Sequence, residues 1–356
     1  MGNHARRLPY LLLVCVGLTA QAPAPDALLI DTHNDVPMRV VKGFDIGKRA
    51  KEGHTDLPRL REGGVGAVFF SVYVGAEYVT GNRSAHRALE MFDAVLGGIV
   101  ARYPNDFLLA RTADDVETAH RQGKIAALIG VEGGHAIEDS LAALRDFYAL
   151  GARYMTLTHV NTNHWADSSG DLDNPKVQHH NGLTDFGRQV IAEMNRLGMI
   201  VDVSHVSDKT FWDVLAASRA PVFASHSSCR ALCDVPRNMT DDMIRALARK
   251  GGVIQINFNA GFLTQRKSPP ANLEDVVAHI GHAVKIGGIG AVGIGSDFDG
   301  IEQPPVGLED VSRFPNLTRA LLAKGYSSED IRKIYGGNTL RLMRAVEGAA
   351  HLQNRQ

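Results

Sequence analysis

The chain of 356 residues is poor in several features that would favour particular classes of protein. Its formal net charge is −1, so it lacks the basic surface with which proteins bind nucleic acid. It has only 14 prolines and is 44% hydrophobic, which is the composition of a compact globular protein rather than a disordered one. We therefore expect a large buried core and a small neutral or zwitterionic ligand, with no nucleic acid as a partner.

Cysteine is also scarce, with 3 in the chain. Cys229 and Cys233 lie four residues apart in the sequence, and a disulfide between them would close too small a loop to stabilise the fold much. Two thiolates cannot form a metal site on their own, so any metal would be held by histidine and carboxylate. The third, Cys15, follows Val14, whose side chain is too bulky for the usual lipid-attachment signal, and this disfavours a lipoprotein.

A hydrophobic run long enough for a membrane anchor is missing near the N-terminus. The run Leu8–Ala20 is shorter than the roughly 20 residues that cross a bilayer as a helix. Arg6 and Arg7 precede it, and small residues and prolines follow, which is the layout of a secretory signal. We predict a signal peptide over residues 1–22, with cleavage within 20–24, and an exported protein that is periplasmic or secreted.

Apolar or β-branched runs alternate with amphipathic helical patterns along the rest of the chain. Several of the helical patterns open on Ser, Thr or Asp and close on Gly, as capped helices do. Eight such units predict a closed (β/α)8 TIM barrel of α/β class. A doubly wound open sheet is the alternative, weakened because no Gly-rich phosphate loop follows the first strand. The eight runs are Leu28–Asp31, Val65–Val74, Ile125–Val131, Arg153–His159, Met199–His205, Pro221–His226, Gly252–Phe258 and Ala291–Asp297.

Nothing in the sequence divides this pattern into separate domains. We predict a single catalytic domain over residues 27–347 and a polar tail over 348–356, and no hydrophobic anchor follows Arg344. The long polar stretch Asn161–Gly182 is typical of a loop over the mouth of the barrel.

Polar side chains fall at the carboxyl ends of six predicted strands. In a closed barrel these ends meet on one face, so residues far apart in sequence become neighbours. The set contains imidazoles and carboxylates but no reactive Cys or Gly-x-Ser-x-Gly elbow, which favours zinc-like cations over an acyl-enzyme. It exceeds what one tetrahedral zinc takes, so we expect two ions sharing a carboxylate, and metal-assisted hydrolysis. The residues are His33, Asp35, Glu132, His159, His205, His226 and Asp297.

Each element of this set also has a structural interpretation. A His-x-Asp triplet such as His33 to Asp35 is expected about once by chance in a chain with 15 histidines. His205 and His226, each taken alone, would equally be interpreted as buried core histidines. The segment Gly295–Gly300 resembles part of a calcium loop but lacks the remaining ligands. Coincidence is disfavoured because all of these residues fall at the same end of their strands.

Seven motifs together resemble the renal, or membrane, dipeptidase family of the amidohydrolase superfamily, from about Leu29 to Val346. The resemblance implies a barrel with two zinc ions per subunit that hydrolyses dipeptides, some with a D-residue at the C-terminal position, and in some members β-lactams. It also leaves open a homodimer. The motifs are DTHNDVP, IGVEGGHAIEDSL, RYMTLTHVNTNHWAD, VDVSHVS, FASHSS, PRNMTDD and GIGSDFDG.

The resemblance also implies roles for single residues. His33 and Asp35 would bind one zinc, His205 and His226 the other, and Glu132 would bridge them around a catalytic hydroxide. His159 would contact the substrate and stabilise the developing oxyanion, and Asp297 would be the acid/base residue. Arg237 would bind the substrate carboxylate, and we place its neighbour Asn238 in the substrate site as well.

Two departures from the family affect these expectations. The lipid-anchor signal and disulfide framework of mammalian members are missing, so we expect a soluble exported enzyme without a disulfide-linked dimer. The segment Asn257–Leu263 lacks the aromatic residue of mammalian members near Asn259, which changes the substrate pocket. Two other functions stay open: hydrolysis of another amide, lactam or ester, and a non-catalytic envelope binding protein.

Overall fold

The structure is a computed structural model that describes residues 27–268 and 270–353. The predicted signal peptide, residues 1–22, and its cleavage region lie outside the described residues. Within the described part of the chain, no helix combines the length and apolar character needed to cross a bilayer.

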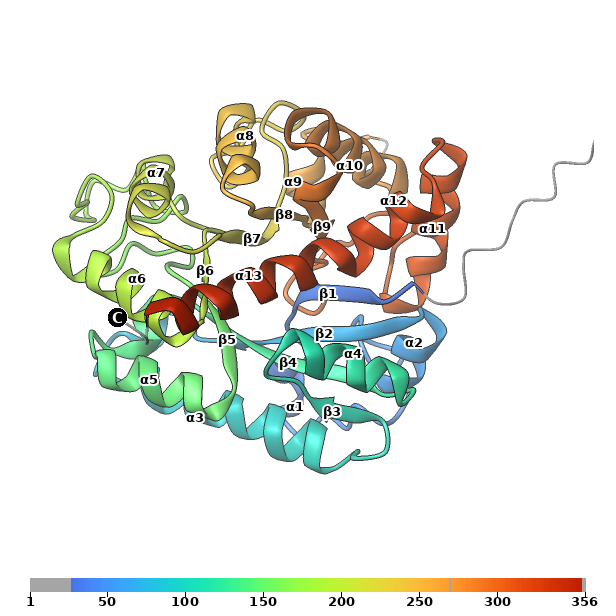
Figure 1. Ribbon diagram of the computed structural model, residues 1–356, viewed down its shortest axis with the longest axis horizontal. Coiled ribbons are helices and arrows are strands. Elements are labelled where there is room, and N and C mark those ends of the chain that lie inside the picture. The colour runs from blue at the N-terminus through green and yellow to red at the C-terminus, as the bar shows by residue number, and fades with distance from the viewer. Residues whose placement is uncertain (1–26, 269, 354–356) are drawn as a thin grey trace, which may run out of the picture.

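Parallel strands form a closed ring in the centre of the molecule, surrounded by helices (Figure 1). Each strand pairs with the next along the chain, except that β2 pairs with β4 and β9 pairs with β1 to close the ring. Eight strands make this ring, which confirms the predicted (β/α)8 TIM barrel. The strands within the described residues are β1 (Leu29–Asn34), β2 (Val65–Tyr73), β3 (Phe107–Leu109), β4 (Ile125–Glu132), β5 (Ala152–Thr156), β6 (Ile200–Asp202), β7 (Phe223–Ser227), β8 (Val253–Ile256) and β9 (Val292–Ile294).

The strand β3 is the one that the sequence pattern did not predict. It has 3 residues and pairs only with the first half of β4, from Ile125 to Ala127. The second half of β4, from Ile129 onward, pairs with β5 instead. Because β3 occupies an edge that β5 leaves free, it lies outside the ring and does not alter the barrel.

The helices cover the outside of the ring. Predicted helix starts are confirmed at several positions, where a side-chain oxygen accepts a backbone N–H of the first turn: Thr184 for α6, Ser207 for α7 and Thr240 for α8. Gly198 ends α6 with φ of 82°, a conformation that favours glycine. The helices are α1 (Pro37–Val40), α2 (Leu57–Glu62), α3 (Ser84–Val95), α4 (Ala113–Arg121), α5 (Leu141–Leu150), α6 (Asp185–Leu197), α7 (Asp208–Ala217), α8 (Asp241–Arg249), α9 (Ala260–Leu263), α10 (Leu273–Gly287), α11 (Phe314–Ala323), α12 (Ser328–Arg332) and α13 (Asn338–Gln353).

Six short segments have other helical geometry. Two are π-helical and continue α3 and α12, and the rest are single 3-10 turns. These segments are η1 (Ala76–Tyr78), η2 (Leu96–Ala101), η3 (Gly134–Ile137), η4 (Ile289–Ala291), η5 (Val311–Arg313) and η6 (Lys333–Gly337).

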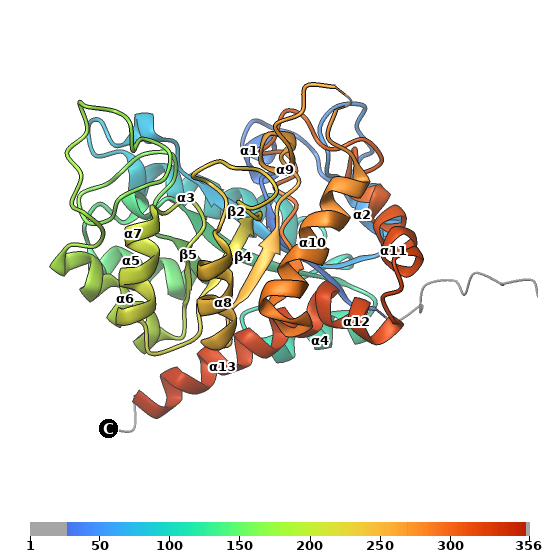
Figure 2. The ribbon, with the colours of Figure 1, turned by 90° about the horizontal axis from the view of Figure 1, so that it is seen from above.

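The last helix, α13, closes one end of the barrel. Its side chains Leu342, Met343 and Val346 are buried in one apolar cluster with residues from the beginning of strands, such as Ile30 and Val253. Figure 2 shows α13 crossing the end opposite to the loops that follow the strands. With this end packed with apolar side chains, the open end of the barrel is the place for a site.

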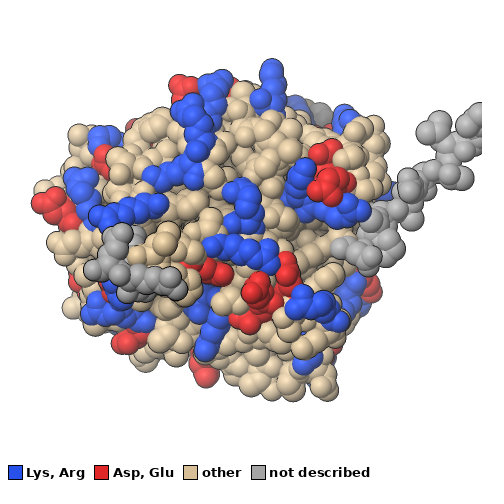
Figure 3. All heavy atoms as spheres, in the orientation of Figure 1, with Lys and Arg blue, Asp and Glu red and all other residues tan. Residues whose placement is uncertain are grey.

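The segment predicted as a polar tail, residues 348–356, begins within α13. The helix α13 runs on to Gln353, past residue 347, so part of the predicted tail is helical. On the face that α13 crosses, basic and acidic side chains lie interspersed (Figure 3).

Cys229 and Cys233 are both free and buried, so they form no disulfide. Burial raises the pKa of the Cys229 thiol to about 12.

Candidate metal centre

The polar residues at the strand ends meet at the open end of the barrel. His33 lies in β1 and His226 in β7, and Glu132 is the last residue of β4. His159 and His205 lie in the loops just after β5 and β6. Three of them, Glu132, His159 and His205, line a cavity of about 300 Å³, which is large enough for a small substrate. Its walls are formed by Asp35, Met38, Tyr73, Glu132, His159, Val160, His205, Asn259, Phe262, Asp297 and Gly300.

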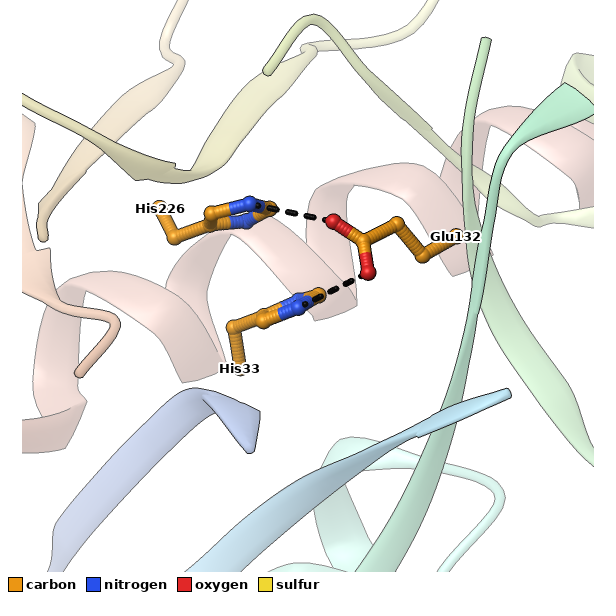
Figure 4. A group of neighbouring side chains, drawn as sticks. All are labelled: His33, Glu132 and His226. Atoms are coloured by element: carbon orange, nitrogen blue, oxygen red, sulfur yellow. Dashed lines mark ion pairs between the residues drawn. The ribbon is translucent and has the colours of Figure 1, made fainter. Parts of the chain in front are cut away.

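Glu132 is the centre of the arrangement. Its Oε2 lies 3.3 Å from the Nε2 of His33, and its Oε1 lies 3.2 Å from the Nε2 of His226. Figure 4 shows the two imidazoles pointing at the two different oxygens of this carboxylate. The Nε2 of His205 is 3.1 Å from Oε1, and that of His159 is 3.9 Å away. A single carboxylate therefore has histidines on both of its oxygens.

A second carboxylate extends the group on the His33 side. Asp35 Oδ2 lies 3.2 Å from His33 Nε2, and Asp297 also belongs to this cluster. The potential ligand atoms form three overlapping groups, and within each group they all lie within 4.8 Å of one another. The groups are His33, Glu132 and His226; Glu132, His159 and His205; and His33, Asp35 and Asp297.

The unpartnered atoms of this cluster fit divalent cations. The Nε2 of His33 and both carboxylate oxygens of Asp35 are buried, and none of them makes a hydrogen bond of good geometry among the described residues, although Nε2 and Oδ2 lie 3.2 Å apart. Buried polar atoms of this kind are costly unless something binds them. Imidazole and carboxylate are the ligands that zinc and similar ions prefer in proteins. The donors present therefore suit metal ions shared through Glu132.

Burial and neighbouring charges set the protonation of these groups. Burial lowers the pKa of His205 and of His226 well below the ordinary value, which keeps both imidazoles neutral. Burial alone would raise the pKa of Glu132, but His33, His159 and the hydrogen bonds of His205 and His226 hold it well below its usual range. Neutral His205 and His226 beside an ionised Glu132 are in the states that bind cations.

Burial has the opposite effect on Asp297. It raises the pKa of this carboxyl well above the ordinary value, and the charges of Asp35 and Glu132 act in the same direction. A carboxyl whose pKa is raised in this way holds a proton more readily than an exposed one, as a group that takes up and returns a proton must.

Two site residues have an unfavourable backbone conformation. His205 has φ of 67° and Asp297 has φ of 65°, in the left-handed region that favours glycine. Each such residue costs about 1–3 kcal/mol and persists only where the surroundings enforce it. The fold therefore stores strain at the two strand ends that carry these side chains.

Tyr154, which no pattern in the sequence singled out, orients the ring of His33. Its hydroxyl lies 2.7 Å from the Nδ1 of His33, so Nε2 is left free to face the carboxylates. Tyr154 is fully buried inside the barrel, and Gly130 on the adjacent strand β4 makes room for it. A Cβ on Gly130 would lie 1.9 Å from Cζ of the tyrosine ring. A glycine within a buried strand was the one signal in the sequence for this close approach.

A similar partner orients His226. The hydroxyl of Ser225 lies 2.7 Å from the Nδ1 of His226 and donates to Asp202 Oδ2 at 2.6 Å. Asp202 is fully buried at the end of β6, so the chain from carboxylate to serine to imidazole is shielded from water. Partners of this kind fix the ring and raise the basicity of the ligand nitrogen.

We expect Tyr154→Phe to weaken cation binding at His33 by about 10- to 100-fold, because the Nδ1 of His33 loses its partner. Competition with a chromogenic chelator measures this affinity. Tyr148→Phe, on the outer helix α5, is the matched control and should bind cations as the wild type does. Equal affinity in the wild type and in Tyr154→Phe would show that the tyrosine does not support the ligand.

Of the three residues predicted to bind substrate, His159 lines the cavity, whereas Arg237 and Asn238 are not among its lining residues. Arg237 lies at the edge of the cluster, where its Nη2 donates to the backbone oxygen of His226 at 2.7 Å. Its guanidinium carbon is 5.4 Å from the ring centre of Phe262, which lines the cavity. The structure does not bring Asn238 into the cavity wall, because its Nδ2 donates to the backbone oxygens of Cys233 and Phe262, each at 2.8 Å.

A (β/α)8 barrel with potential histidine and carboxylate ligands gathered at its open end is the arrangement of metal-dependent hydrolases. The sequence profile described as membrane dipeptidase, peptidase family M19, matches residues 20–356. This chain belongs to that family, and it is a dipeptidase of the metallopeptidase class.

Individual relatives agree with this assignment. An uncharacterized dipeptidase of Schizosaccharomyces pombe is 40% identical over 340 residues, which cover 90% of this chain and 81% of the relative. The probable dipeptidase PvdM from Pseudomonas aeruginosa is 28% identical, with a TM-score of 0.85 over 91% of this chain and 96% of that chain. A metallopeptidase from Rhodobacter sphaeroides, solved with a phosphinate mimic of the dipeptide L-Ala-D-Ala, is 30% identical, with a TM-score of 0.81 over 90% and 99% of the two chains.

Proposed function

We propose that this dipeptidase uses two zinc ions per subunit, shared through Glu132, to hydrolyse both L-L and L-D dipeptides. The observation that carries the proposal is the position of Glu132, whose Oε2 faces the imidazole of His33 while its Oε1 faces those of His205 and His226. One carboxylate with ligands on both oxygens is the arrangement that two-metal hydrolases use.

The ligand atoms divide into two sets around this carboxylate. His33 and Asp35 would hold one ion with Glu132, since His33 Nε2 lies 3.2 Å from Asp35 Oδ2 and 3.3 Å from Glu132 Oε2. His205 and His226 would hold the other, since both Nε2 atoms lie within 3.2 Å of the same oxygen of Glu132. When bound, such ions lower the pKa of a water molecule towards neutrality and polarise a carbonyl group.

The remaining residues of the cavity would handle charge and protons. His159 lines the cavity with its Nε2 3.9 Å from Glu132 Oε1, and we propose that it stabilises the negative charge that develops on the carbonyl oxygen. Asp297 would accept the proton of the attacking water and return it to the leaving amine. Asn257 holds this carboxylate in place by donating from Nδ2 to Asp297 Oδ2 at 2.9 Å.

Arg237 would select dipeptides by binding the free carboxylate of the substrate. Two of its N–H groups are engaged, with Ser227 Oγ and the backbone oxygen of His226, and its Nε is buried without a partner among the described residues. A guanidinium offers five donors in a fork that matches a carboxylate. A longer peptide would extend past this position, so tripeptides should be poor substrates.

The proposal for L-D substrates is supported by a relative. The Rhodobacter sphaeroides metallopeptidase, 30% identical to this chain, was solved with a mimic of L-Ala-D-Ala. The similarity covers 90% of this chain.

A dipeptide panel assayed with and without chelator tests the function. We expect L-L and L-D dipeptides to be hydrolysed, activity to be lost with chelator, and zinc to restore it. Activity confined to other amides or to β-lactams would instead indicate a related amidohydrolase. No hydrolysis with the metal site loaded would indicate a binding protein.

Arg237→Ala should mainly raise KM, by roughly 10- to 150-fold, because a hydrogen bond to a charged group contributes about 1.5–3 kcal/mol. The comparison uses steady-state kinetics on one dipeptide and on its C-terminal amide, which lacks the negative charge. For the amide, the KM of Arg237→Ala should equal that of the wild type. An unchanged KM for the free dipeptide would remove the arginine from substrate binding.

We further propose that the protein is exported to the periplasm or secreted. The support comes from the sequence of residues 1–22, where two arginines precede the apolar run Leu8–Ala20. Cell fractionation and N-terminal sequencing should give a mature chain that starts within residues 20–25. A full-length chain in the cytoplasm would contradict the proposal.

A further inference from the structure

The loop after β9, which carries Asp297, is strained at two positions. Asp297 and Asp299 both lie in the left-handed region, with φ of 65° and 66°. The following residue, Gly300, passes so close to the site that a Cβ there would lie 2.3 Å from Asp35 Oδ2 and 2.6 Å from Asp297 Oδ1. A loop of this shape returns to a relaxed conformation unless other residues restrain it.

Strand β1 and the residue after β8 provide restraints on one side of the loop. The backbone N–H of Asp297 donates to the oxygen of His33 at 3.0 Å, and that of Asp35 donates to the oxygen of Phe298 at 2.8 Å. Asn257 donates to the Asp297 carboxylate at 2.9 Å. These bonds leave the residues after Phe298 to be held from the other side.

His54, from the segment before α2, holds that other side through Asp299. The backbone N–H of Asp299 donates to His54 Nδ1 at 2.9 Å, and the backbone N–H of His54 donates to Asp299 Oδ1, also at 2.9 Å. Arg39 Nη1 reaches the same carboxylate oxygen at 3.3 Å. The Asp299 side chain is only 1% exposed, so water competes little with this reciprocal pair of bonds.

The close approach of the two segments depends on Gly53. Its φ is 71°, and a Cβ there would lie 2.6 Å from Asp299 Oδ1 and 1.9 Å from Arg39 Nη1. The ring of His54 also packs 5.5 Å from that of Phe298, between centres. Backbone, ring and carboxylate are therefore fitted to one another where the loop after β9 meets the segment before α2.

We propose that His54 is a positioning residue for Asp297. By accepting the N–H of Asp299 at Nδ1, it fixes the second left-handed residue and so the direction in which the Asp297 carboxylate points. Since Nδ1 accepts this bond, the proton of the neutral ring lies on Nε2. The inference rests on the proposed acid/base role of Asp297.

A pair of substitutions separates the role of Nδ1 from the mere presence of a polar side chain. In His54→Asn, the amide oxygen falls close to the position of Nδ1, whereas the longer side chain in His54→Gln places its amide near the position of Nε2. We expect His54→Gln to lower kcat by about 10- to 100-fold, because a small displacement of a catalytic group has this effect. We expect His54→Asn to keep most of the activity, and metal content and KM to stay unchanged in both.

The Asp297→Asn background tests whether His54 acts through Asp297. There, His54→Gln should lower kcat no further, because the group that it positions is already disabled. An equal fall in both backgrounds, or equal kcat in His54→Gln and the wild type, would overturn the inference. If Asp297→Asn alone left kcat unchanged, the acid/base role itself would fail, which is a separate result.

Hydrogen exchange gives a readout that does not depend on activity. The peptide containing residues 297–300 should exchange its amide hydrogens faster in His54→Gln than in His54→Asn or the wild type. Equal exchange in all three proteins would show that the bond to Asp299 does not restrain the loop.

Discussion

Glu132→Gln should lose both cations together and lower kcat/KM by at least about 10³-fold. In the carboxylate, one oxygen faces His33 and the other faces His226, so each cation can receive one oxygen. The amide has only one oxygen and no charge, so it cannot serve both cations. A bound metal supplies several kcal/mol of transition-state stabilisation, and each 1.36 kcal/mol is a factor of ten in rate. Metal analysis after dialysis, together with dipeptide kinetics, measures both effects.

Glu138→Gln is the matched control for this variant. Glu138 follows Glu132 in the same segment but accepts the backbone N–H of Ala85, at the start of α3, through Oε1. An amide oxygen can still accept this bond, so the control should bind two cations and keep its activity. Loss of one cation rather than both in Glu132→Gln would contradict the shared position of Glu132.

Asp297→Asn should leave both cations bound and lower turnover by about 10²–10⁴-fold, the range typical of general acid/base catalysis. The amide has nearly the same shape as the carboxyl, so the cavity changes little, but it cannot accept and return a proton. Metal content and kcat are measured on the same preparation, so that a loss of ions is distinguished from a loss of proton transfer.

The leaving group provides a control for the role of Asp297. A substrate whose leaving amine is activated, such as an aminoacyl anilide with an electron-withdrawing ring, depends less on a proton at the moment of bond cleavage. The fall in turnover should therefore be smaller for this substrate than for a dipeptide. Full turnover of both substrates by Asp297→Asn would remove this residue from the mechanism.

The site was predictable because the period of the barrel is visible in the sequence. Buried parallel strands read as apolar runs, so the polar residue that ends each run marks the same rim of the barrel. This placed His33, Glu132 and His226 together without any structural information. The helix starts were equally visible, because capping residues such as Thr184 have a direct physical role.

What the sequence did not reveal are contacts that no period marks. Tyr154 reads as an ordinary aromatic residue of a buried strand, and only its contact with His33 Nδ1 shows its role. The strand β3 has too few residues to produce a pattern. Asn238, which we also predicted in the substrate site, donates from Nδ2 to two backbone oxygens, and no sequence pattern marks these bonds. The left-handed backbone conformation of Asp299 is likewise set by contacts in the folded chain that no sequence pattern marks.

The central claim is that one carboxylate from β4 joins two cations, and a crystal structure of the zinc-loaded enzyme tests it most directly. Anomalous scattering at the zinc absorption edge locates each ion independently of the chain. We predict two peaks per subunit, each bound to a different oxygen of Glu132, with His33 and Asp35 on one and His205 and His226 on the other. A single peak, or two peaks without Glu132 between them, would contradict the account.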